Sequence, residues 1–204
     1  MEYLYKLASS VIAGIMIGVG GLAYLSCSNI YIGYIWFSIG LLTILIFKLD
    51  LFTGKAGYIL NGYGIKNLII IWFGNFMGTY ITSICKNTRL VGLQDKVNQI
   101  MMVKESDTYF SLFILGIWCG LLMFIAVNTF NTYQFNFATI AIIIFCVSAF
   151  IIIGFEHCIA DMFYMIYSNS LTFNNIIRII VISCGNVIGC NIIPIYKVKE
   201  DKRI

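Results

Sequence analysis

Gly154-Phe155-Glu156-His157-Cys158-Ile159-Ala160-Asp161 interrupts an apolar segment that extends from residue 135 to 168. A second interruption, Lys48-Leu49-Asp50-Leu51-Phe52-Thr53-Gly54-Lys55, divides the segment at 31–62 in the same way. Both interruptions carry charged side chains at the depth where a membrane-crossing segment has its middle. Such backbone is tolerated there only if it is buried in protein or lines a water-filled cavity. The two breaks therefore predict a pathway through the chain.

The composition of the chain indicates an integral membrane protein. Of its 204 residues, 60% are hydrophobic and 11% are charged, whereas soluble domains carry about 25% charged residues. Apolar runs near the length of about 20 residues that crosses the hydrocarbon core recur along the sequence. They predict six spans, at 7–26, 31–62, 66–86, 109–129, 135–168 and 173–195. The first run lacks a strong basic leader and a small-residue cleavage site, so we expect a span there and not a signal peptide.

The charged residues and the cysteines argue against several other classes of protein. The formal net charge of +4 comes from basic residues scattered over loops and the tail, so no nucleic-acid partner is expected. The seven cysteines form no Cys-x-x-Cys pair, so we expect free thiols and neither a metal nor a cofactor. The sequence contains no nucleotide-binding loop and no nucleophile elbow, and we therefore expect no enzyme.

Short motifs recur in the two halves of the chain. Gly74-Asn75-Phe76-Met77-Gly78 in the third span recurs as Gly185-Asn186-Val187-Ile188-Gly189 in the sixth. Gly14-x-x-x-Gly18 in the first span likewise matches Gly116-x-x-x-Gly120 in the fourth. Small residues at this spacing let helices approach closely, and their recurrence in the same order predicts two homologous halves.

The halves should cover about 1–86 and 105–196 of a single transmembrane domain, followed by a basic tail at 197–204. Because three spans is an odd number, the second half must enter the membrane from the opposite side. The predicted fold class is therefore all-α integral membrane, with six transmembrane helices in an inverted 3+3 repeat and broken second and fifth helices. The basic tail favours cytoplasmic termini in the cell (inner) membrane, although the basic residues of the loop at 86–108 argue for the opposite orientation.

Four residues in or near the breaks could carry function. His157 is the only histidine, and its charged form would cost at least about 3 kcal/mol at the bilayer centre, so we expect a neutral ring that is either functional or structural. Glu156 could cap the short helix that follows. Thr53 could bind anions together with free backbone amides of its break, or it could be a helix cap. Lys104 could draw anions into a vestibule or could be an interfacial lysine.

The motifs together identify the chain as similar to the formate/nitrite transporter family. The resemblance is carried by four segments in the right order: Leu51-Phe52-Thr53-Gly54, Trp72-Phe73-Gly74-Asn75-Phe76-Met77-Gly78, the block from Gly154 to Met162, and Gly185-Asn186-x-x-Gly189. It implies a homopentamer of aquaporin-like protomers, each with its own pore for small anions. It also implies that Thr53 faces His157, and that Lys104, twelve residues before Gly116, attracts anions.

The resemblance also supplies candidate pore residues. The substrate pathway is expected to include Thr53, His157, Lys104, Gly120, Asn75 and Asn186. The hydrophobic narrowings are expected at Phe37, Leu41, Phe52, Met123 and Phe150. Three positions depart from the family pattern, because Gly120 replaces a pore asparagine, Met123 replaces a valine and Asp161 replaces an asparagine.

The expected function is a passive or proton-coupled conduit for a small monovalent anion of a weak acid, such as formate, nitrite or hydrosulfide, across the lipid bilayer. A neutral-solute channel for water or a small polyol is an alternative, although the paired Asn-Pro-Ala signature is missing and the single proline, Pro194, ends the sixth span. A non-conducting structural or regulatory membrane protein is the third reading.

Overall fold

Helices form nearly all of the computed structural model, which describes residues 1–133 and 135–201. No strand occurs among those residues, so the predicted all-helical fold class is confirmed. The helices are α1 (Glu2–Ser26), α2 (Ile30–Ile46), α3 (Phe52–Ala56), η1 (Ile59–Asn61), α4 (Ile65–Ser83), η2 (Ile84–Asn87), η3 (Arg89–Leu93), α5 (Gln94–Ser106), α6 (Tyr109–Thr132), α7 (Phe137–Ile153), α8 (Cys158–Tyr167) and α9 (Phe173–Asp201). The side chains of the predicted basic tail, 197–204, lie outside the described part.

Four of these helices are long and apolar enough to cross a membrane: α1, α4 together with η2, α6 and α9. The pair α7 and α8 passes the same test as one broken span, with a bend of 57° at the break. The second predicted broken span corresponds to α2, an apolar helix of 17 residues, followed by a break and the short helix α3. Long membrane-spanning helices and a break in the fifth predicted span are therefore present.

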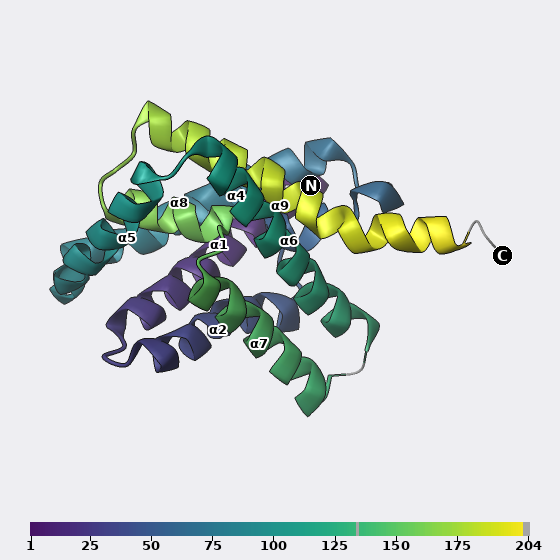
Figure 1. The fold of residues 1–204 in the computed structure, drawn as a ribbon, viewed down its shortest axis with the longest axis horizontal. Helices are drawn as coiled ribbons and strands as arrows, with labels where there is room; N and C mark the ends of the chain where they lie inside the picture. Colours follow the sequence, from purple (N-terminus) through teal and green to yellow (C-terminus); the bar gives the residue numbers. More distant parts are fainter. Residues whose placement is uncertain (134, 202–204) are drawn as a thin grey trace.

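A helix occupies most of the loop expected at 86–108. In α5 only Val97 and Met101 are buried, so the helix presents a narrow apolar stripe that a search for apolar runs does not detect. Lys96 ties α5 to the rest of the molecule, because its Nζ donates to the Leu25 carbonyl at 2.7 Å. Figure 1 shows the segment that carries α5 projecting at the left edge of the bundle.

Glycines bring α1 against α4 and α6 against α9, with the helices of each pair parallel. A Cβ on Gly14 would meet the backbone of Asn75, and one on Gly120 would meet the backbone of Asn186. Gly14 therefore corresponds to Gly120, whereas the order of the sequence motifs had aligned it with Gly116. The motif alignment was wrong by one helical turn because small residues recur every four positions. These matched contacts agree with an inverted arrangement of the two halves, which stays a prediction.

The two helices that precede the breaks, α2 and α7, lie side by side (Figure 1). Each is followed by a residue in the left-handed region, Lys48 with φ 54° and Gly154 with φ 83°. A left-handed residue ends an α-helix by turning the chain away from its axis. The local backbone therefore stops both helices at equivalent places and directs the following residues back into the protein.

Candidate functional site

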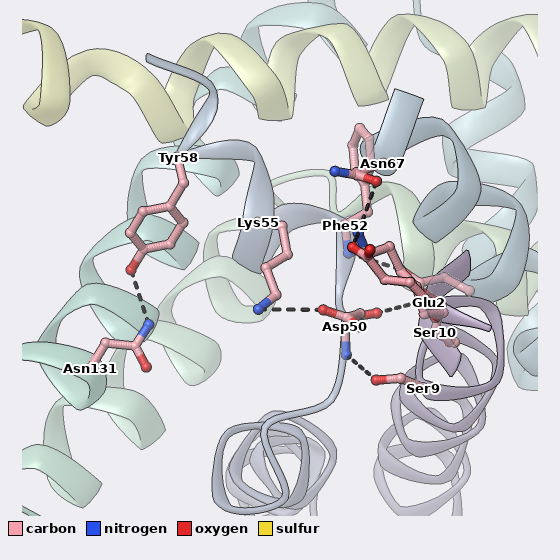
Figure 2. Close-up of polar contacts among 11 residues, drawn as sticks. Glu2, Ser9, Ser10, Asp50, Phe52, Lys55, Tyr58, Asn67 and Asn131 are labelled. Atoms are coloured by element: carbon pink, nitrogen blue, oxygen red, sulfur yellow. Dashed lines mark hydrogen bonds and ion pairs between the residues drawn. The ribbon is translucent and has the colours of Figure 1, made fainter. Parts of the chain in front are cut away.

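The side chain of Asn75, in α4, holds the first break in place. Its Oδ1 accepts a hydrogen bond from the Phe52 amide at 2.8 Å, and its Nδ2 donates to the carbonyls of Asp50 at 3.0 Å and Ser10 at 2.7 Å. The Asp50 amide in turn donates to the Ser9 hydroxyl at 3.0 Å (Figure 2). Backbone groups that the break removes from a helix are thus satisfied by side chains, as a membrane interior requires.

Asn186, in α9, does the same for the second break. Its Oδ1 accepts from the Cys158 amide at 3.0 Å, and its Nδ2 donates to the carbonyls of Glu156 and Gly116, both at 2.8 Å. Phe52 and Cys158 are the first residues of α3 and α8, so the two asparagines occupy matching roles. Both N–H groups of each amide are used within the chain. Asn75 and Asn186 therefore position the breaks, and their expected place in the substrate pathway stays a prediction.

Thr53 and His157, one from each break, meet inside the protein. Their side chains are joined by a hydrogen bond of 3.0 Å between Thr53 Oγ1 and His157 Nε2, and the residues are 1% and 2% exposed. His157 Nδ1 accepts from the Ala160 amide at 3.2 Å, so a neutral ring carries its proton on Nε2 and donates it to Thr53. The Thr53 hydroxyl hydrogen is then left to donate to another group.

The same contact assigns the cap of α8. The side chain that accepts a hydrogen bond from the first turn of α8 is that of His157. The sequence had suggested Glu156 for this role. Glu156 instead turns its carboxylate toward Lys104. The Cys190 thiol of α9 lies within weak hydrogen-bond distance of two carbonyls, those of Thr53 at 3.3 Å and Gly120 at 3.2 Å.

Lys104, near the end of α5, is surrounded by two carboxylates. Its Nζ contacts Glu156 Oε2 and lies 2.8 Å from Asp161 Oδ1. The side chains of Lys104, Glu156 and Asp161 are 16%, 7% and 4% exposed, respectively. Burial by itself would lower the pKa of Lys104, but the charges of Asp161 and Glu156 outweigh it and raise that pKa above its usual range. Lys104 therefore carries its positive charge at physiological pH.

A cavity opens beside this cluster, on the side of the molecule where α1 ends. It has a volume of about 240 Å³, and its lining includes Tyr24, Lys104, Phe150, His157 and Asp161. The histidine of the central pair thus stands at its inner end, and the charged cluster forms part of its wall.

A second cavity has a volume of about 180 Å³ and is lined by Leu49 and Leu51 of the first break. The Asp50 amide between them donates to Ser9, near the beginning of α1, so this cavity lies toward that end of α1. Its lining includes Leu41, Lys48, Gly54 and Lys55. Lys55 forms an ion pair of 3.3 Å with Asp50 at this end (Figure 2). Gly54 follows Thr53 directly, so the Thr53–His157 pair separates two cavities that open toward opposite ends of α1.

The apolar residues expected to narrow a pore are all buried, but they do not form one group. The Phe37 and Phe150 rings meet edge to face at 5.8 Å, and Phe150 stacks on His157 at 5.7 Å. Leu41 lines the second cavity. Phe52 instead lines an apolar groove between α4 and α9. Met123, the fifth of these residues, lies in the core. Gly120, which the sequence places in the substrate pathway, lies against the α9 backbone.

Sequence reasoning missed the grouping of Glu156 and Asp161 around Lys104. A signal was available for Asp161, since it lies four residues after His157 and therefore one turn further along the same helical face. No signal was available for Glu156, whose direction depends on the bend between α7 and α8. Among the described residues, no group of three or more His, Cys, Asp or Glu side chains is arranged to hold a metal ion.

Comparison with known proteins gives consistent matches. The sequence pattern of the formate/nitrite transporter family matches residues 1–196. A formate-nitrite transporter of Entamoeba histolytica is 26% identical over 88% of the chain, and the formate channel FocA of Haemophilus influenzae is 28% identical over 65% of it. These matches span 59% and 51% of the relatives' own lengths.

Two solved structures share the fold. A pentameric formate channel with formate bound superposes with a TM-score of 0.79 at 24% identity and covers 93% of each chain. An ion channel described as belonging to the FNT family superposes with a TM-score of 0.78 at 22% identity, and covers 93% of this chain and 87% of its own. At these identities the structures establish the fold and not the solute.

Proposed function

Because the chain belongs to the formate/nitrite transporter family, we propose that it is a membrane channel for small monovalent anions of weak acids, of the formate, nitrite and hydrosulfide class. Two of the relatives are named as formate channels, one of them with formate bound. The proposal for this chain depends on its own buried groups and on the two cavities that lie on either side of the Thr53–His157 pair.

The Thr53–His157 hydrogen bond is the observation that carries the proposal. With Nδ1 accepting from Ala160, the ring donates to Thr53 Oγ1, and the hydroxyl hydrogen remains to donate to a solute oxygen or sulfur. A hydroxyl oriented in this way presents a donor, which suits an anion. The pair lies between the two cavities, so a solute that crosses the protomer passes this donor.

The proposed route begins at Lys104 and ends in the second cavity. Lys104 attracts the anion into the first cavity, Phe150 and Phe37 narrow the passage, Thr53 binds the solute, and Leu41 borders the exit. A bare anion is penalised by several kcal/mol among such apolar groups, whereas the neutral acid is not. A proton taken up with the anion removes this penalty, so we propose that transport is proton-coupled.

The assembly proposed for the chain is a homopentamer in which every protomer has its own pore. Two observations support it: one of the structural relatives is a pentameric channel, and many large apolar side chains are exposed on the isolated protomer. We propose the inverted halves 1–86 and 105–196 as its internal architecture, and the cell membrane with cytoplasmic termini as its location.

A neutral-solute channel is a second candidate. It is favoured by the two carboxylates around Lys104, which cancel the charge that would attract an anion. Osmotic swelling of vesicles in a small polyol without transport of formate is the result expected of it. A non-conducting protein would give neither signal.

The test is stopped-flow transport in proteoliposomes that contain the purified protein, with formate, nitrite, hydrosulfide, chloride and lactate as solutes at several pH values. We expect formate transport that exceeds chloride transport, rises as the external pH falls and decreases in Thr53→Ala and His157→Phe. Formate transport by the wild-type protein that is unchanged in both variants contradicts the proposed roles of Thr53 and His157. Wild-type vesicles no more permeable to any of the anions than empty vesicles contradict the function itself.

A further inference from the structure

Asp161, like Glu156, is a charged residue that lines the first cavity and that the proposed route does not use. It stands in the first turn of α8, four residues after His157, and its carboxylate forms part of the cavity wall together with Lys104.

The Asp161 carboxylate has one ion-pair contact, through Oδ1, and an oxygen, Oδ2, that bonds no described residue. Oδ1 lies 2.8 Å from Lys104 Nζ. Oδ2 has no hydrogen-bond partner in the part of the chain that the structure describes, although the side chain is only 4% exposed. The Asp161 carboxylate is the functional group of formate attached to a helix, and its ion-pair partner among the described residues is the Lys104 ammonium group.

The charges of Lys104, Glu156 and Asp161 determine how strongly Lys104 attracts an entering anion. Lys104 supplies one positive charge, and Glu156 and Asp161 can supply two negative charges. Arg178 lies nearby, but its guanidinium donates to the backbone carbonyls of Lys104, Glu105 and Asp107 and contacts neither carboxylate. Among the three side chains that touch one another, an anion that binds Lys104 while both carboxylates are ionised therefore meets a net charge of −1. The charge of Arg178, held at the neighbouring backbone, offsets part of it.

We propose that the Asp161 carboxylate competes with the permeating anion for Lys104, and so sets the anion concentration at which this vestibule fills. The inference rests on the proposed anion transport. A tethered carboxylate is present at a high effective concentration, so free anions occupy Lys104 only at high concentration. Asp161 thus acts as a specificity-determining residue that lowers affinity without blocking the path.

The test compares formate transport by the wild-type protein, Asp161→Asn and Asp161→Ser in proteoliposomes at constant ionic strength, over a range of formate concentrations. We expect the half-saturation concentration to fall about three- to tenfold in both variants, since one negative charge near Lys104 is removed. Glu105→Gln is the matched control. It removes one negative charge from the next residue of α5, whose carboxylate binds Asn175 and not Lys104, and its half-saturation concentration should not change.

The outcomes separate a competitive role from a structural one. A purely structural role for Asp161 would lower the thermal unfolding midpoint and the maximal rate at an unchanged half-saturation concentration, which would overturn the inference. A decrease of the same size in Glu105→Gln would overturn it as well, because the effect would then be long-range charge. Absence of formate transport by the wild-type protein contradicts the proposed function, a result distinct from either of these.

Discussion

Thr53 Oγ1 lies 3.0 Å from His157 Nε2, although 104 residues separate the two in the sequence. The contact joins the two breaks at a place from which water is largely excluded, since both residues are nearly inaccessible. A hydrogen bond in such a site orients both groups. Because the ring donates to Thr53 Oγ1, the hydroxyl hydrogen is left to donate elsewhere, as the proposed binding of a solute requires.

The first prediction concerns that hydroxyl. Thr53→Val keeps the shape of the side chain and deletes the donor, so formate transport should fall about tenfold or more, in line with the loss of a hydrogen bond to a charged group. Thr53→Ser keeps the hydroxyl and should remain within about threefold of the wild type. The measurement is the initial rate of formate efflux from proteoliposomes with equal protein content. Equal rates for the Val and Ser variants would rule out the hydroxyl as the solute's donor.

The second prediction concerns the charge of Lys104. Its pKa is raised above the usual range because Asp161 and Glu156 outweigh the effect of burial, so the ammonium form persists as the pH rises past the value at which an ordinary lysine loses its proton. Amine-specific labelling, which requires the neutral form, should therefore leave Lys104 largely unmodified between pH 8 and about 10.5. The exposed Lys66 serves as the internal control. Parallel labelling of both lysines, measured by peptide mass spectrometry, would contradict the prediction.

The third prediction concerns the asparagine that holds the second break. Asn186→Leu removes three hydrogen bonds and leaves the Cys158 amide without a partner in a buried site. Each unsatisfied buried group costs about 1–3 kcal/mol, so the variant should give little folded protein or a markedly lower thermal unfolding midpoint in detergent. Asn131→Leu is the matched control, because Asn131 is exposed and its side chain bonds only Tyr58 among the described residues, at 3.0 Å (Figure 2). A normal midpoint for Asn186→Leu would show that the break does not need this side chain.

The fourth prediction concerns the close contact of Gly120 with α9. A Cβ at this position would meet the carbonyl of Asn186 on α9, so Gly120→Asn must push α6 away from α9 and should destabilise the protein by about 1–3 kcal/mol. Gly64→Asn, at an exposed N-cap with only Asn67 nearby, should leave stability unchanged or slightly improved. The measurement is thermal unfolding of the purified protein. A tolerated Gly120→Asn would mean that the two helices can separate at this point.

Much of the fold follows from local properties of the sequence. The apolar runs predict the long helices because a bilayer requires every backbone polar group to be satisfied within a segment of fixed length. The charges at 48–55 and 154–161 mark the breaks for the same reason. Helix α5 escaped prediction because its buried face consists of Val97 and Met101 with Ile100 partly buried beside them, and the polar residues between them keep the average hydropathy of the segment low.

The sequence by itself determined which chemical groups the membrane interior contains: a hydroxyl at Thr53, an imidazole at His157 and a carboxylate at Asp161. Only the tertiary structure decided how they are grouped. The bend of 57° between α7 and α8, and the asparagine bonds that hold both breaks, bring Thr53 to His157 and Asp161 to Lys104. The physical reason is that hydropathy depends on the residues within one segment, whereas these contacts join segments about 50 to 100 residues apart, and their geometry is fixed by packing between helices.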